Sequence, residues 1–139
     1  MMTKQENNNQ EEMDLVTTLN SEENKLMNAQ MVTLDIPFFI KNILKDKSWK
    51  KKDRNTISLY KSNGFSVVLV ALKKGSEITK HIAKGTMAIQ VIKGRIIFKT
   101  DDKSSDIRKG QMLALHPGIP HSALAKKKSI FLLILSIEK

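Results

Sequence analysis

Imidazole is the side chain through which this sequence could do chemistry. The 139-residue chain has three histidines, His81, His116 and His121, and no cysteine. Imidazole changes charge near neutral pH, accepts or donates hydrogen bonds, and ligates transition metals. Without cysteine there is neither a thiolate nucleophile or ligand nor a disulfide. The sequence therefore leaves three roles open, namely proton transfer, metal coordination, and polar contact with a bound small molecule.

The first of two glycine-bounded stretches contains His81. Five residues separate it from Gly75, and the stretch ends at Gly94. Ala83 follows two positions after His81, and Met87 follows four positions after Ala83. A histidine flanked in this way by short strands and turns can face a pocket, with the alternate residues of its strand beside it.

The second stretch contains the other two histidines. Its pattern is Gly110, five residues, His116, one residue, Gly118, two residues, His121, three residues, Ala125. Prolines on both sides of Gly118 fix the chain direction, and the glycine permits a sharp turn into the strand that starts at His121. His116 is therefore either a polar group at the mouth of a pocket or a solvent-facing turn residue.

The two spacings resemble the paired motifs of the cupin family, G-x5-H-x-H-x3-E-x6-G and G-x5-P-x-G-x2-H-x3-N. His116 and Ala125 stand where the second motif has proline and asparagine. The resemblance implies a double-stranded β-helix, the jelly-roll barrel of small single-domain, RmlC-like cupins. It also implies that three histidines and one glutamate would hold a divalent ion, and those positions here are His81, Ala83, Met87 and His121.

Half of that ligand set is missing. The expected cofactor is therefore none, or a weakly bound divalent transition metal held by His81 and His121. Met87 replaces the only anionic ligand, and a thioether is a soft, weak one. Glu77, four residues before His81 and of the same strand parity, stays open as a ligand outside the motif.

Short apolar segments separated by Gly, Pro, Asp and Ser predict an all-β fold from residue 55 onward. No helical segment interrupts them, which excludes a βαβ fold and favours a sandwich or barrel. The predicted strands are Thr56–Tyr60, Phe65–Leu72, Glu77–His81, Thr86–Ile92, Arg95–Thr100, Asp106–Arg108, Gln111–Leu115, His121–Ala125 and Ser129–Ile137.

Alternation along these strands predicts a mostly apolar pocket containing imidazoles. No carboxylate in either motif is expected to point inward. The predicted lining residues are His81, Ala83, Met87, Ile89, His116, His121 and Ala123.

Residues 1–30 predict a disordered or partly helical polar tail, with a short helix at Ser21–Met27, and residues 31–139 form the predicted barrel domain. Met31–Ile36 could form a first strand, followed by a short helix or turn at Pro37–Leu44. The chain shows neither a signal peptide nor an apolar run long enough to span a membrane, so we expect a cytoplasmic protein without a membrane partner.

Charge is uneven along the chain. The first 30 residues have two lysines and six acidic residues, whereas the remainder has 22 basic and eight acidic residues. The lysines fall in predicted turns without interleaved aromatic residues, so we expect a solvated surface and no specific nucleic-acid partner.

Two classes of function are compatible with these residues. The favoured hypothesis is a noncatalytic or sensory barrel that binds an unidentified small molecule, because the charged ligand of the family's metal site is missing. The alternative is a small metal-dependent or histidine-assisted enzyme, such as an oxygenase or isomerase.

The last strand bears on assembly, because Ile130 to Leu135 are all apolar and both faces of the strand must be covered. One face can line the barrel. The other needs Pro37–Leu44 or a second subunit, and cupins commonly pair through such strands, so a homodimer is expected.

Overall fold

The computed structural model describes residues 29–137, and within them two helices precede nine strands. The helices are α3 (Ile36–Lys45) and α4 (Lys47–Lys51). The strands are β1 (Arg54–Ser62), β2 (Phe65–Leu72), β3 (Glu77–His81), β4 (Thr86–Lys93), β5 (Arg95–Thr100), β6 (Ser104–Arg108), β7 (Met112–Leu115), β8 (His121–Ala125) and β9 (Ser129–Ser136).

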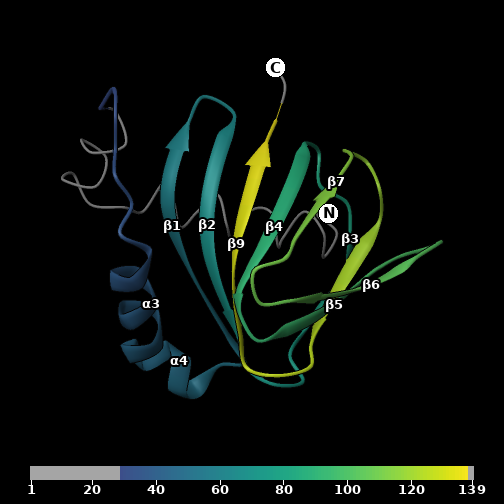
Figure 1. Cartoon of the computed structure of the whole chain (residues 1–139), viewed down its shortest axis with the longest axis horizontal. Coiled ribbons are helices and arrows are strands. Elements are labelled where there is room, and N and C mark those ends of the chain that lie inside the picture. Colours follow the sequence, from purple (N-terminus) through teal and green to yellow (C-terminus); the bar gives the residue numbers. More distant parts are fainter. Residues whose placement is uncertain (1–28, 138–139) are drawn as a thin grey trace, which may run out of the picture.

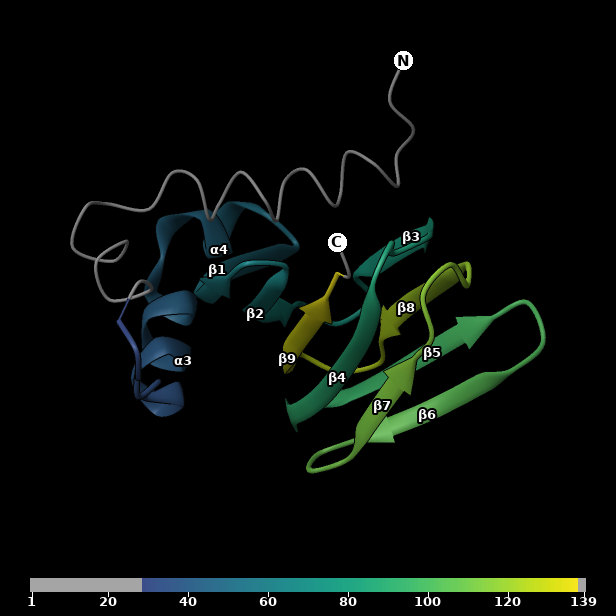
Figure 2. The ribbon, with the colours of Figure 1, turned by 90° about the horizontal axis from the view of Figure 1, so that it is seen from above.

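The strands form two antiparallel sheets that face each other (Figures 1 and 2). One sheet has the order β1-β2-β9-β4-β7 and the other β3-β8-β5-β6. Inward side chains of both sheets form one apolar core, because every second residue of a strand points to the same face. This arrangement confirms the predicted all-β jelly-roll barrel.

The predicted strands agree closely with the observed ones. Four strands have the predicted bounds, namely Phe65–Leu72, Glu77–His81, Arg95–Thr100 and His121–Ala125, and the others differ at their ends only. The Asn63-Gly64 turn joins β1 to β2, and of its two residues only Gly64 has a positive φ, 85°.

The predicted strand at Met31–Ile36 is wrong. Residues 31–35 have no regular structure, and α3 begins at Ile36. The Asp35 side chain accepts a hydrogen bond from the backbone N–H of Phe38, and Pro37 lies in the first turn, so the local sequence starts a helix. The short helix α4 was not predicted.

Nearly all of the predicted polar tail, and the helix predicted at residues 21–27, lie outside the described residues. Within the described part of the chain, no helix is long and apolar enough to cross a membrane.

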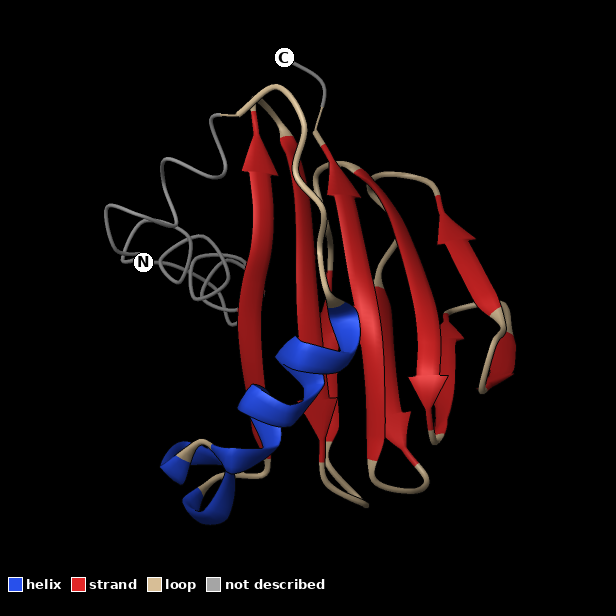
Figure 3. Cartoon of the chain, turned by 60° about the vertical axis from the view of Figure 1, so that its left-hand side comes forward, coloured by secondary structure: helices blue, strands red, loops and turns tan. Residues whose placement is uncertain are grey.

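Helix α3 covers the outer face of the five-stranded sheet, over strands β1, β2 and β9 (Figure 3). Ile43 on the helix and Ile130 on β9 are both fully buried in this second apolar cluster, which also contains Leu69 and Ala71 of β2. Phe131 of β9 points the other way, into the barrel core. Both faces of β9 are thus covered within one chain, and the covering segment is the predicted Pro37–Leu44.

The turn between β4 and β5 depends on Gly94. Its φ is 94°, and a Cβ there would collide with the side chain of Ser129 and the carbonyl oxygen of Lys128. Gly110 also has a positive φ, 85°, but a Cβ there would meet nothing within 4 Å.

We therefore expect Gly94→Ala to lower the free energy of unfolding by several kcal/mol, roughly 3 or more, since backbone strain and overpacking combine. Gly110→Ala is the matched control and should cost about 1–2 kcal/mol, because it introduces strain alone. Urea unfolding of both variants measures the difference. Equal losses of unfolding free energy in the two variants would show that the close contact between Gly94 and Ser129 does not exclude a Cβ at this turn.

Candidate functional site

His81 and His121 are brought together across the β3–β8 pair. They face each other in the strand register, with ring centroids 4.2 Å apart and ring planes at 60°. Phe98 of β5 stacks on the other side of His121, with centroids 5.2 Å apart and planes at 15°. The site is therefore a pair of imidazoles against an aromatic wall.

A bulge in β3 directs His81 inward. Ile78 pairs with Ala123 and His81 with His121, so three residue steps on β3 match two on β8. Because of the extra residue, Ile78 lies on the same side of the sheet as His81, and Glu77 lies on the opposite side. Glu77 is exposed and does not line the cavity, so the parity argument that kept it as a possible ligand is wrong.

Both rings have their Nδ1 atoms bonded to backbone carbonyls. Nδ1 of His121 lies 2.8 Å from the oxygen of Ile119, and Nδ1 of His81 lies 2.9 Å from the oxygen of Thr79. A carbonyl only accepts, so each Nδ1 carries the hydrogen and each neutral ring keeps its lone pair on Nε2. Nε2 of His121 is buried and has no hydrogen-bond partner among the described residues.

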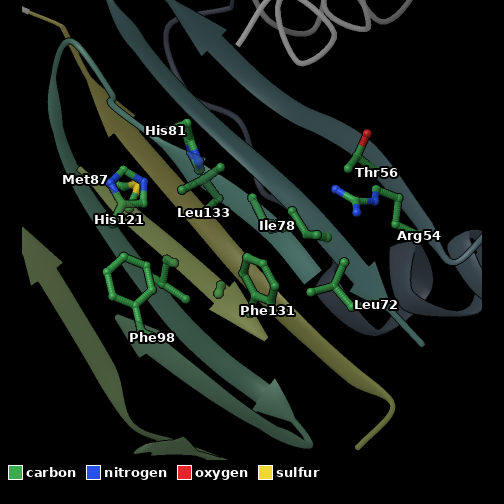
Figure 4. Close-up of a pocket in the computed structure, with 13 residues that line it drawn as sticks. Arg54, Thr56, Leu72, Ile78, His81, Met87, Phe98, His121, Phe131 and Leu133 are labelled. Carbon is green, nitrogen blue, oxygen red and sulfur yellow. The ribbon is translucent and has the colours of Figure 1, made fainter. Parts of the chain in front are cut away.

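A cavity of about 70 Å³ opens beside these rings, between the two sheets (Figure 4). Its walls are mostly apolar. The lining residues are Arg54, Thr56, Val70, Leu72, Ile78, His81, Met87, Ile89, Phe98, His121, Ala123, Phe131 and Leu133.

Five of the seven residues that the sequence assigned to the pocket lie in this lining, namely His81, Met87, Ile89, His121 and Ala123. Ala83 is buried in the core, 5% exposed, without lining the cavity. His116 is exposed in the loop between β7 and β8, outside the cavity.

Arg54 and Thr56 are lining residues that the sequence analysis missed. Both lie on β1, outside the two glycine-bounded stretches, and Arg54 pairs in register with Leu72 of the inward-facing core. Alternation along residues 54–58 could have shown that Arg54 and Thr56 share one face of their strand. Nothing in the sequence places that face opposite His81 and His121.

The electrostatics favour neutral imidazole at His121. Burial lowers the pKa of His121 from its usual 6.5, the carbonyl of Ile119 raises it, and the nearby His81 lowers it. The side chain is only 2% exposed. A proton on this ring would be poorly solvated, and none of the lining residues in the described part of the chain is a carboxylate that could pair with it.

The free energy of unfolding should consequently fall as the pH falls below 6.5. The unfolded chain protonates His121 first, so stability is complete above the unfolded pKa and is lost toward the lowered folded pKa. The slope contributed by one proton approaches about 1.4 kcal/mol per pH unit. Urea unfolding between neutral and mildly acidic pH should show this slope in the original chain and in His116→Gln, but not in His121→Phe. An unchanged slope in His121→Phe would contradict the assignment.

The residues present do not fit a resident divalent metal ion. The two imidazoles lie in contact, but the remaining family positions are Ala83 and the thioether of Met87, and no described residue that lines the cavity is an anionic ligand. Throughout residues 29–137, no group of three or more His, Cys, Asp or Glu side chains is arranged to hold a metal ion.

The geometry and topology define the fold as the double-stranded β-helix of cupins, and solved structures agree. A cupin superfamily protein from Desulfitobacterium hafniense matches with a TM-score of 0.59 and 18% identity over 61% of this chain and 78% of that one. An RmlC-like cupin from Shewanella frigidimarina matches with a TM-score of 0.59 and 17% identity, covering 63% and 78% of the two chains.

A conserved protein of unknown function from Streptococcus pyogenes matches with a TM-score of 0.60 and 22% identity, covering 63% of this chain and 78% of that one. Salicylate 1,2-dioxygenase from Pseudoaminobacter salicylatoxidans matches at 0.65 and 13% identity, over 72% of this chain but 33% of the enzyme. No protein-family model and no curated protein matches the sequence. At these identities the likeness establishes the fold alone.

Proposed function

We propose that this chain is a noncatalytic cupin barrel that binds a small organic molecule in the cavity between its sheets. The observation that carries the proposal is a mostly apolar cavity lined by two imidazoles, one of which, His121, has a buried Nε2 without a partner, and by no carboxylate among the described residues. Apolar walls with a few convergent polar groups are typical of small-molecule sites.

The same lone pairs support the alternative of a histidine-assisted enzyme. A neutral imidazole with a free Nε2 can accept a proton from a substrate. Such a reaction also needs an acid or a second base, and the polar cavity residues besides the histidines are Arg54 and Thr56. Neither side chain is an ordinary proton donor near neutral pH, so binding without turnover is the better fit.

Native mass spectrometry with elemental analysis of freshly purified protein tests the proposal. We expect a small-molecule adduct and well below one equivalent of transition metal per chain. The adduct should disappear in Ala123→Leu, which fills the cavity, and persist in Ala88→Leu, which adds the same atoms on the outer face of the other sheet. Stoichiometric metal that is lost in His81→Ala would overturn the noncatalytic proposal in favour of a metal-dependent activity.

The oligomeric state stays a prediction. Helix α3 covers the face of β9 that motivated the homodimer, so that strand no longer requires a second subunit. Light scattering at micromolar concentration measures the mass, and a dimer mass would have to arise from another surface.

A further inference from the structure

We propose that the ligand of this cavity is a short aliphatic hydroxycarboxylate, with its carboxylate at Arg54 and Thr56 and its hydroxyl at the two histidines. This inference rests on the proposed function, since it assigns a ligand class to the same cavity. Figure 4 shows Arg54 and Thr56 on one side, His81 and His121 on the other, and apolar side chains between them.

Arg54 is held as a carboxylate receptor. Its Nη2 donates a 2.6 Å hydrogen bond to the backbone oxygen of Glu77, which ties the guanidinium of β1 to β3. Its Nε lies 3.4 Å from a carboxylate oxygen of Asp53, a weak contact with a residue that does not line the cavity. A guanidinium has five N–H donors, so about three stay available to a ligand in a fork that suits a carboxylate.

The charge of the lining calls for one negative charge on the ligand. Among the described residues that line the cavity, Arg54 is the only permanently charged one, and the lowered pKa of His121 keeps that ring neutral at physiological pH. The carboxylate of Asp53 accepts hydrogen bonds from Nε of Arg54 and from the hydroxyl of Ser76, but it does not line the cavity. A monocarboxylate therefore matches the cavity better than a cation or a neutral molecule.

The histidine end calls for a hydrogen-bond donor. Both Nδ1 atoms are bound to carbonyls, so the Nε2 atoms offer acceptors only. The buried Nε2 of His121 has no partner within the described part of the chain, and a ligand hydroxyl would provide one. A molecule with a carboxylate at each end would place a second anion against these lone pairs, which excludes dicarboxylates.

The length and the width of the cavity restrict the class of ligand further. Glu77, whose oxygen anchors Arg54, is about three strand positions from His81 after the bulge, roughly 10 Å. Hydrogen bonds of about 3 Å at each end leave about 4 Å between the carboxylate oxygen and the hydroxyl oxygen of the ligand, which a chain of about two or three carbons spans. The cavity volume of about 70 Å³ is close to that of two water molecules in the liquid, so the middle must be slender, without a ring.

Calorimetric titration of the purified protein with three probes tests this assignment. The probes are 3-hydroxypropanoate, its neutral analogue 3-hydroxypropanamide, and propanoate, which lacks the hydroxyl. We expect the hydroxy acid to bind about 10-fold or more tightly than either analogue, because each analogue loses one of the two polar contacts. Arg54→Gln should remove the preference for acid over amide and keep the preference for the hydroxyl, whereas the exposed Arg108→Gln should change neither.

Arg54→Lys is a second variant that separates loss of binding from a folding defect. Lysine keeps the positive charge but lacks the paired N–H donors of the guanidinium, so this variant should keep part of the preference for the acid over the amide. Equal affinity for acid and amide in the original chain would overturn the carboxylate assignment while leaving cavity binding intact. Failure of all three probes to bind at millimolar concentration would overturn the ligand class. Whether the cavity binds any small molecule is decided separately, by the adduct in native mass spectrometry and its loss in Ala123→Leu.

Discussion

A chain that carries Ala83→His together with Met87→Glu should bind Zn²⁺ or Co²⁺ on the order of 100-fold or more tightly than the original chain. His81 and His121 are already paired, and Met87 lines the same cavity. Ala83 does not line the cavity, but it is buried in the same apolar core as Met87. We expect the longer side chains of the two substitutions to reach the imidazole pair and to complete a set of three imidazoles and one carboxylate. The visible absorption of bound Co²⁺ reports both affinity and geometry.

The matched control is Ala88→His together with Met112→Glu, which introduces the same side chains on the outward face of neighbouring strands β4 and β7. It should give no gain, because no imidazole pair faces that surface. A double variant at Ala83 and Met87 that folds but binds no more metal than the original would show that these positions are not equivalent to the family's ligand positions.

Most of the barrel could be predicted because its determinants are local. Gly75, Gly94, Gly110 and Gly118 all adopt positive φ in the structure, and such residues mark the ends of strands in the sequence. The strand at Met31–Ile36 was wrong for a local reason too, since the capping by Asp35 was overlooked. Helix α4 consists of five residues, mostly lysine, and has no apolar periodicity to reveal it.

The candidate site could be predicted only as far as the motifs extend. The spacing of His81 and His121 anticipated their convergence, whereas the bulge in β3 is a property of how β3 pairs with β8 and has no signal in β3 alone. Arg54 belongs to a strand of the other sheet, and its place at the cavity depends on the packing of both sheets. The sequence therefore identified the histidine end of the cavity and missed the cationic end.

Tertiary structure also changes how the lysine runs are understood. The side chain of Lys73 contacts the backbone oxygen of Lys50 and lies 5.4 Å from the ring centroid of Trp49, and the turn after it is tied to Ala125, next to the run 126–128. Three lysine runs that are far apart in the sequence, residues 50–52, 73–74 and 126–128, thus meet at one end of the barrel (Figure 1). Trp49 packs against the outer apolar cluster between α3 and the sheet.

Ile43→Asp should have the largest effect on stability, because it places a carboxylate in the apolar cluster between α3 and the sheet. Ile43 is fully buried there. Loss of the apolar side chain and burial of an unpaired charge together should cost about 4 kcal/mol or more. In a domain of this size the melting temperature should fall by more than about 10 °C.

The same substitution should also change the solution behaviour of the chain. If α3 detaches, Leu69, Ala71, Ile130 and Leu132 become exposed as one apolar patch, and such patches drive self-association. Lys41→Asp on the exposed side of α3 is the control and should change the unfolding free energy by no more than about 0.5 kcal/mol. Calorimetry and light scattering of both variants measure the two effects. An Ile43→Asp protein that melts and scatters like Lys41→Asp would mean that the sheet does not need α3 as its cover.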